Sequence, residues 1–238
     1  LSMTYQTARR FYKEVTTILI EGAFQVALDG RSVRTPSGAD LGLPTAALAE
    51  AIAREWAAQT DTIDPGTMPL MQLACTALDR VIPNRSAIVA DTVAYGRSDL
   101  LCYRAGDPPE LVQKQAEAWQ PILDWLSTDV DATLLVTTGI MHVAQDDAAI
   151  AALNQTVAAF EDFPLTALAQ MTQVFGSLAL ALAVARVHIP WTKAVDLAAL
   201  DEVYQAERWG EDSEAMERRR NMRAEAEQAS RFLELCKA

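Results

Sequence analysis

Hydrophobic positions divide the chain into an alternating N-terminal part and a helical remainder. Residues 16–20 are apolar and mostly β-branched, and residues 24–28 alternate in the manner of a half-buried strand. The Asp29-Gly30 pair that follows predicts a hairpin, because both positions of such a turn need a positive φ. With one further short strand at 41–43, the first 43 residues are predicted to form a small antiparallel sheet.

From residue 44 onward, the apolar residues recur at the spacing of helices. Thr45 is expected to cap the first helix. Segment 68–81 is apolar over most of its circumference, which predicts a helix at the centre of the fold. Further helices are predicted at 84–95, 108–126 (kinked or divided at Pro121), 147–160, 165–187, 193–208 and 213–236, with a strand at 100–103 and a hairpin of 134–136 with 140–143.

These elements predict an α+β fold in which a small antiparallel β-rich domain precedes a larger, mainly helical one. The turn chemistry of Asp64-Pro65-Gly66 marks the change between them. We therefore predict an N-terminal domain with one helix over residues 1–62 and a helical domain over 63–238. A length of 238 residues accommodates one large or two small domains, at roughly 100–200 residues each.

The net charge of the chain limits the classes of molecule that it could bind. The net charge of −12 argues against nucleic acid, because phosphate binding needs clustered Lys and Arg, and it also argues against anionic membrane surfaces. An acidic surface suits a basic protein partner or simply solubility, and composition does not separate these two interpretations. Residues 163–185 carry no charge, but Gln, Thr, Ser, Pro and Gly interrupt them, so a buried helix is expected rather than membrane insertion.

Cysteine usage and the start of the chain predict the compartment. Cys75, Cys102 and Cys236 are far apart and lie in apolar surroundings, which is typical of free thiols in a reducing compartment. The first residues, LSMTYQ, resemble neither a signal peptide nor an Arg-rich transit sequence. A soluble, cytoplasmic protein is therefore expected.

The familiar catalytic and cofactor motifs are missing. His142 and His188 stand in separate segments without the spacing of a metal site, so no metal is predicted. Ser177 does not lie in a nucleophile elbow, and Cys75 lies in an apolar helix where its pKa should rise. No glycine-rich phosphate loop is present, and we predict neither a cofactor nor an enzymatic activity.

The densest acidic cluster surrounds Trp209-Gly210. Its members are Glu207, Glu211, Asp212, Glu214 and Glu217. One interpretation is structural: Trp209 anchors the core, and Asp212 or Ser213 caps the last helix. The other is an acidic surface with an aromatic anchor that binds a protein partner. The residues alone leave both open.

An ordered set of motifs resembles one protein family. The motifs are FQVALDGRSVRTP (24–36), LPT (43–45), EW (55–56), MPLMQLACTALDRV (68–81), YGRSDLLCYRA (95–105), QxxxWxP (115–121) and YQxxxWGE (204–211). Together they resemble the chaperone that escorts the alpha subunit of the rotary ATP synthase headpiece during assembly, in mitochondria and some bacteria. The resemblance implies an ATP-independent monomer that binds unassembled alpha subunit and shields the surface that later meets the beta subunit. Because no transit sequence is recognisable, this chain resembles a bacterial cytoplasmic member, whereas eukaryotic relatives would act in the mitochondrial matrix.

The resemblance also implies where the client binds. The acid after Trp-Gly is expected to be functional, which here means Glu211 or Asp212, within a partner-binding segment that also contains Tyr204, Gln205 and Trp209. Arg97 and Asp99 are secondary candidates, with a local ion pair or helix cap as the structural alternative.

Two other functions stay open at this point. A small hydrolase or lyase could use Glu211 and Asp212 as acid and base, provided that a pocket raises a carboxylate pKa. A non-specific adaptor would bind the beta subunit as well as alpha.

Overall fold

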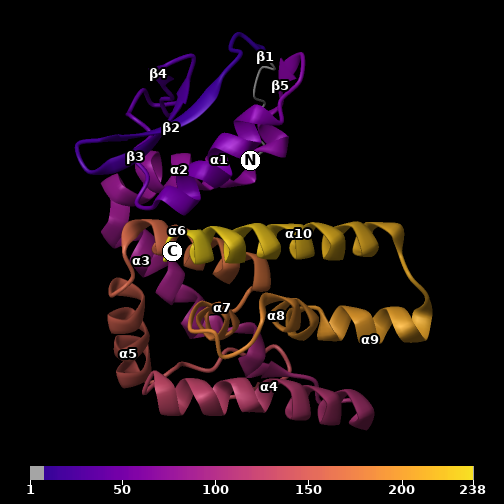
Figure 1. Cartoon of the computed structure of the whole chain (residues 1–238). Helices are drawn as coiled ribbons and strands as arrows, with labels where there is room; N and C mark the ends of the chain where they lie inside the picture. Colours follow the sequence, from indigo (N-terminus) through magenta and orange to yellow (C-terminus); the bar gives the residue numbers. More distant parts are fainter. Residues whose placement is uncertain (1–7, 238) are drawn as a thin grey trace. The chain divides into compact units, whose positions relative to one another are not determined.

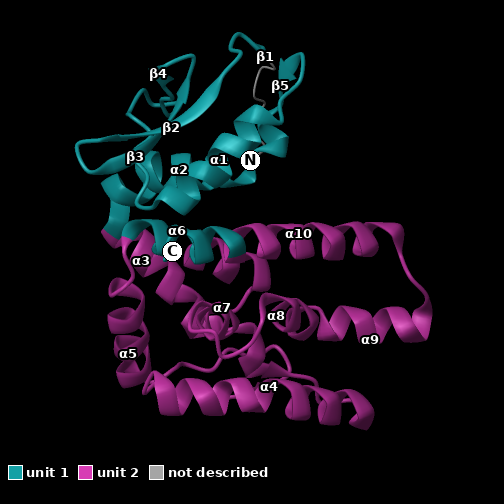
Figure 2. Cartoon of the chain, in the orientation of Figure 1, with its two compact units in different colours: residues 1–85, 162–167, 231–238 teal, residues 86–161, 168–230 magenta. Residues whose placement is uncertain are grey.

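The structure is a computed structural model that describes residues 8–237. The segment LSMTYQT, which includes the start that entered the prediction of compartment, lies outside the described residues. The chain forms two compact units (Figure 2). Unit 1 consists of residues up to 85 with 162–167 and the segment from 231, and unit 2 consists of 86–161 and 168–230. The predicted boundary after residue 62 falls inside unit 1, and the division into domains 1–62 and 63–238 stays a prediction.

Unit 1 contains the expected antiparallel sheet. Strands β2 (Val15–Ile20), β3 (Ala23–Leu28) and β4 (Arg31–Ser32) lie in that order, with β3 between the other two. Asp29 and Gly30 both have positive φ, as the predicted hairpin between β3 and β4 requires. Residues 41–43 contribute a single bridge from Leu43 to Phe24 rather than a strand. Residues 25–28 are all buried, so β3 is covered on both faces instead of half-buried.

Unit 1 also contains two helices: the first packs on the sheet, and the second packs on the first helix. α1 (Ala46–Ala57) packs on β2 and β3, and Thr45 caps it as predicted by accepting a hydrogen bond from the Leu48 N–H at 3.1 Å. The predicted helix at 68–81 forms as α2 (Pro69–Thr76) continued by a π-helical turn (Ala77–Val81). Glu55 of α1 accepts hydrogen bonds from the N–H groups of Leu70 and Met71 at 2.8 and 2.9 Å, so it caps the start of α2.

Distant segments of the chain complete unit 1. Thr45 Oγ1 donates to the carbonyl of Leu235 at 2.6 Å, and Phe163 stacks on Phe232 with ring centroids 6.1 Å apart. The 3-10 helix η1 (Pro65–Thr67) and the short pair of β1 (Ala8–Arg9) with β5 (Thr62–Ile63) also belong to this unit.

Unit 2 is mainly helical (Figure 1). Its helices are α3 (Arg85–Ala94), α4 (Pro109–Asp129), α5 (Asp147–Ala158), α6 (Asp162–Phe175), α7 (Leu178–Ala185), α8 (Trp191–Ala198), α9 (Leu200–Trp209) and α10 (Ser213–Leu235), of which α3, α6 and α10 also reach into unit 1. All eight residues of α7 are buried, so α7 is the central helix of this unit. Helix α2 belongs to unit 1, and the expectation that 68–81 lies at the centre of the whole fold stays a prediction.

Two predicted long helices are each divided. The segment 165–187 breaks at Gly176, which adopts the left-handed conformation with φ 64°, and Ser177 then caps α7 through the Leu180 N–H. The segment 193–208 breaks at Ala199 into α8 and α9. Pro121 does not divide α4. The helix runs unbroken from Pro109 to Asp129, 21 residues in all.

The predicted hairpin at 134–143 is wrong. Instead, β7 (Thr137–Thr138) pairs in parallel with β6 (Tyr103–Arg104), and the 3-10 helix η5 (Leu100–Cys102) occupies most of the strand predicted at 100–103. The Gln145 side chain takes the place of the second strand, because it accepts from the Leu135 N–H at 2.7 Å and donates to the Leu135 carbonyl at 3.0 Å.

Candidate functional site

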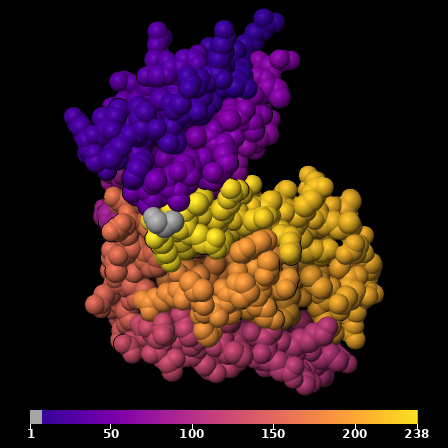
Figure 3. Space-filling view, viewed as in Figure 1, coloured from indigo at the N-terminus to yellow at the C-terminus, as the bar shows by residue number. Residues whose placement is uncertain are grey.

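The predicted partner-binding segment forms the end of a helical hairpin. α9 and α10 are antiparallel neighbours joined at residues 210–212, and their surfaces adjoin along one edge of unit 2 (Figures 1 and 3). Glu202 of α9 lies 3.9 Å from Arg218 and 3.7 Å from Arg219 of α10. On its other side, α9 contacts α4 through an ion pair of Glu207 with Lys114 at 3.4 Å.

Local sequence determines where the hairpin turns. Gly210 ends α9 with a φ of 94°, a conformation that favours glycine. The next helix starts at Ser213, and the Asp212 carboxylate accepts a hydrogen bond from the Glu214 N–H at 3.3 Å. Asp212 therefore caps α10. The sequence alone left the choice between Asp212 and Ser213 open.

Trp209 is a surface residue. It is 76% exposed at the end of α9, so the interpretation that it anchors the core is wrong. Gln205, one turn earlier, is also exposed. Tyr204 instead is buried, and two cations lie over its ring: the Lys114 ammonium at 5.3 Å and the Arg208 guanidinium at 5.2 Å from the centroid.

The two acids after Trp-Gly have different local contacts. Glu211 accepts a hydrogen bond from Arg219 Nη2 at 2.9 Å, and the same guanidinium approaches Glu202. Glu211 therefore ties the turn to α10, whereas Asp212 caps that helix. Both carboxylates are exposed at the end of the hairpin. They do not lie in an enclosed pocket of the kind that the hydrolase hypothesis requires.

The secondary candidates lie elsewhere in unit 2. Arg97 is exposed in the 3-10 helix η4 (Tyr95–Ser98). Asp99 is fully buried and accepts hydrogen bonds from Ser177 Oγ, the Ala179 N–H and the Leu101 N–H. Asp99 thus caps helix starts inside the unit, as the structural alternative predicted, and its carboxylate offers no surface to a partner.

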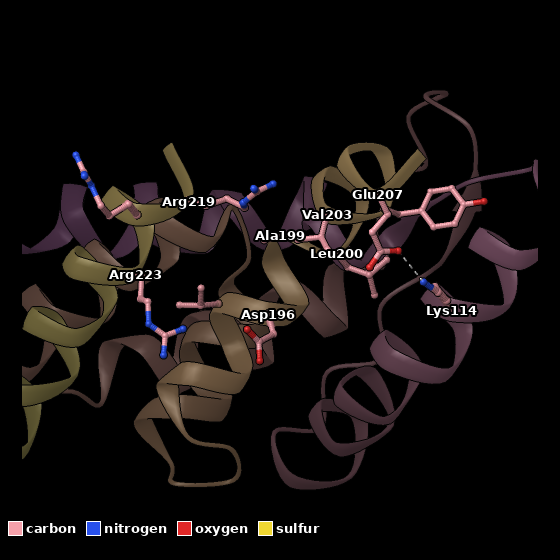
Figure 4. Close-up of a pocket in the computed structure, with 11 residues that line it drawn as sticks. Lys114, Asp196, Ala199, Leu200, Val203, Glu207, Arg219 and Arg223 are labelled. Atoms are coloured by element: carbon pink, nitrogen blue, oxygen red, sulfur yellow. Dashed lines mark hydrogen bonds and ion pairs between the residues drawn. The ribbon is translucent and has the colours of Figure 1, made fainter. Parts of the chain in front are cut away.

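A groove beside the hairpin was not predicted. It has a volume of about 570 Å³ and is formed by α4, α8, α9 and α10 (Figure 4). Its lining residues are Lys114, Val195, Asp196, Ala199, Leu200, Val203, Tyr204, Glu207, Arg219, Arg220 and Arg223. The RRR run at 218–220 and Arg223 were the signal in the sequence, but only packing shows that three of these four arginines share one groove.

The described part of the chain contains no evident metal or membrane element. Within residues 8–237, no group of three or more His, Cys, Asp or Glu side chains is arranged to hold a metal ion. No helix in that range combines the length and the apolar character needed to cross a membrane.

Comparison with known proteins identifies the class. The model of the family described as ATP12 chaperone protein matches residues 9–127. The mitochondrial protein atp12 of Schizosaccharomyces pombe is 25% identical over 228 residues, covering 88% of this chain and 76% of that protein. The crystal structure of Atp12 from Paracoccus denitrificans is 43% identical, with a TM-score of 0.93 over 96% of this chain and 98% of that one. A variant of the Paracoccus protein with lysine in place of an aspartate gives a TM-score of 0.94 at the same identity and coverage.

These relatives define a molecular chaperone rather than an enzyme. The chain belongs to the ATP12 chaperone family, and its role is in the assembly of ATP synthase, as the resemblance of its motifs implied. Its binding partner is accordingly a protein.

Proposed function

We propose that the client is the unassembled alpha subunit of the ATP synthase headpiece, and that the chain shields the surface of alpha that later meets the beta subunit. An unassembled ring subunit exposes apolar interface area that promotes aggregation, so a holding partner must cover it until the true neighbour arrives. We further propose that the chain acts as a monomer in a bacterial cytoplasm. Its bacterial relatives at 43% identity and its free cysteines are consistent with this compartment.

The observation that carries this proposal is the exposed Trp209 beside Glu211 and Asp212. Large aromatic side chains dominate the energetics of protein interfaces, and nearby charges increase the association rate with a surface of opposite sign. We assign the client contact to the hairpin end, defined as Gln205, Trp209, Glu211 and Asp212. Tyr204 is buried and supports the hairpin end from within unit 2. We leave Asp99 out because it is buried, and we keep Arg97 as a peripheral candidate on the same unit.

A refolding experiment tests this function. Alpha subunit is diluted from denaturant with the protein, without nucleotide, and beta subunit serves as the comparison client. We expect alpha to stay soluble in a stoichiometric complex and beta to aggregate. Equal retention of both subunits would instead identify a non-specific adaptor, and loss of both would contradict the chaperone function.

Variants locate the contact. Trp209→Ser and the Glu211→Lys, Asp212→Lys pair are expected to reduce the retention of alpha. Ile140→Ser is the matched control, because Ile140 is an apolar residue of unit 2 that is 94% exposed outside the hairpin. Circular dichroism must show that each variant remains folded. Full retention of alpha by both hairpin variants would exclude the hairpin end as the contact.

A further inference from the structure

The groove beside the hairpin end combines an apolar floor with a cationic wall. The apolar side chains come from α8 (Val195), from α9 (Leu200 and Val203) and from Ala199 between the two helices. Val203 is 39% exposed even though it lines a concave surface. An open apolar depression of this kind is a site where the side chains of a partner can be buried.

The charge of the groove opposes that of the whole chain. Four cationic side chains line it, but only two acids do, Asp196 and Glu207, in a protein of net charge −12. Glu207 already pairs with Lys114. Figure 4 shows Arg219 and Arg223 extending from α10 on one side of the groove and Lys114 on the other.

Two of these cations are not ion-paired with any residue that the structure describes. Among residues 8–237, neither Arg220 nor Arg223 forms an ion pair, whereas Arg218 and Arg219 are both paired with Glu202. The Arg223 guanidinium lies over the Trp191 ring at 5.4 Å, which keeps it beside the groove without neutralising it. The groove therefore offers uncompensated positive charge next to apolar surface.

The floor also has unused hydrogen-bonding capacity. Within the described chain, the buried hydroxyl Tyr204 Oη has no hydrogen-bond partner. Tyr204 is only 6% exposed and lines the groove. Buried polar atoms are normally paired, so this hydroxyl favours a ligand that brings a hydrogen-bonding group.

We propose that this groove binds an apolar client segment that carries at least one carboxylate. The apolar side chains of the segment pack on Val195, Leu200 and Val203, and its carboxylate pairs with Arg220 or Arg223. Planar guanidinium groups recognise carboxylates through paired hydrogen bonds. This proposal rests on the proposed chaperone function and adds the chemistry of the bound segment: the hairpin end presents acids to the client, and the groove receives an acid from it.

The test uses the full chain and labelled model peptides. One peptide contains leucine, alanine and two glutamates, and two others have the same sequence with glutamine or lysine in place of glutamate. Fluorescence anisotropy measures the affinity of each. We expect the glutamine peptide to bind about tenfold more weakly than the glutamate peptide, and the lysine peptide more weakly still. Equal affinity of the glutamate and glutamine peptides would overturn the proposal.

Charge reversal locates the binding. Arg220→Glu with Arg223→Glu is expected to abolish the preference for the glutamate peptide. Arg54→Glu with Arg80→Glu is the control, because it makes the same change in net charge at exposed residues of unit 1. A labelled single-stranded oligonucleotide serves as a second anionic probe. Binding of the oligonucleotide as tight as that of the glutamate peptide would indicate a general anion site and contradict the proposal.

The same variants separate this proposal from the function on which it rests. If wild-type protein fails to retain alpha subunit, the chaperone function itself is wrong. If wild type retains alpha and the Arg220→Glu, Arg223→Glu variant retains it equally well, the function stands and the groove proposal fails. We expect the groove variant to lose retention while the Arg54→Glu, Arg80→Glu control keeps it.

Discussion

Ser177 Oγ donates a hydrogen bond to Asp99 Oδ1 over 2.7 Å inside unit 2. The Ala179 N–H donates to the second carboxylate oxygen at 3.0 Å, so the two residues together cap the start of the buried helix α7. This contact joins positions 78 residues apart. Asp99, the acid of the YGRSDLL motif, therefore has a structural role inside unit 2 rather than a role in partner binding.

Asp99→Asn should change how stability depends on pH. Burial raises the pKa of Asp99, although hydrogen bonds from Ala179, Ser177, Leu101 and Leu178 oppose this. A raised folded pKa means that the folded state holds the proton more tightly than the unfolded chain, so this contribution favours folding at acid pH and is lost as pH rises through the folded pKa. We expect the advantage of wild type over Asp99→Asn in free energy of unfolding to shrink as pH rises above about 4. Urea denaturation across pH measures it, and an advantage that grows with pH would contradict the raised pKa.

Gly96→Ala should destabilise unit 2 by overpacking. A Cβ at Gly96 would lie 2.5 Å from Leu153 Cδ1, and both residues are buried. We expect a loss of about 1–3 kcal/mol in the free energy of unfolding. Combining Gly96→Ala with Leu153→Val removes the clashing methyl group, so the double variant should lose less than the sum of the single changes. Strict additivity in chemical denaturation would show that the two side chains do not meet.

Trp119→Phe should lower the free energy of unfolding by more than the loss of buried ring area alone would. The Trp119 indole N–H donates to the Leu197 carbonyl at 2.9 Å, and Trp119 has no exposed surface. The variant removes that hydrogen bond and leaves a small cavity, so we expect about 2–4 kcal/mol of destabilisation in urea denaturation. Trp209→Phe, at an exposed site, is the control and should stay within about 0.5 kcal/mol of wild type. Similar losses at both sites would contradict this assignment.

Cys75 and Cys102 should react slowly with thiol reagents in the folded protein. Burial, reinforced by Asp79 and Asp99 respectively, raises the pKa of each thiol to about 12. The reactive thiolate is therefore scarce at mildly alkaline pH. Alkylation followed by peptide mass spectrometry should find both cysteines unmodified in buffer and modified in denaturant. Rapid labelling of either one in the folded state would show that its helix opens readily.

The sequence by itself determined the elements whose signals are local. Asp29-Gly30 specified the β3–β4 hairpin through its positive φ values, and Thr45 specified the start of α1 through its side-chain oxygen. The spacing of apolar residues predicted α10 to within a residue at its C-terminal end. The ordered motifs also identified the chaperone family, which the comparisons confirm.

Several of those motifs carry their meaning only in three dimensions. Glu55 of the EW pair caps α2, and the Gln115 side chain of QxxxWxP accepts from the Ala105 N–H and donates to Asp201, both at 2.7 Å. These contacts are between residues far apart in sequence, so no spacing rule reveals them.

Tertiary structure alone decided which surfaces are available to a partner. Trp209 and Tyr204 are both aromatic residues of α9, yet packing against α4 buries Tyr204 and leaves Trp209 exposed. The break at Ala199 has no sequence signal, but it turns α9 so that α8, α9 and α10 enclose a groove. Net charge is a sum over the chain and hides the cations that gather there. Local chemistry therefore set the helices and turns, whereas burial and juxtaposition, which depend on long-range packing, set the binding surface.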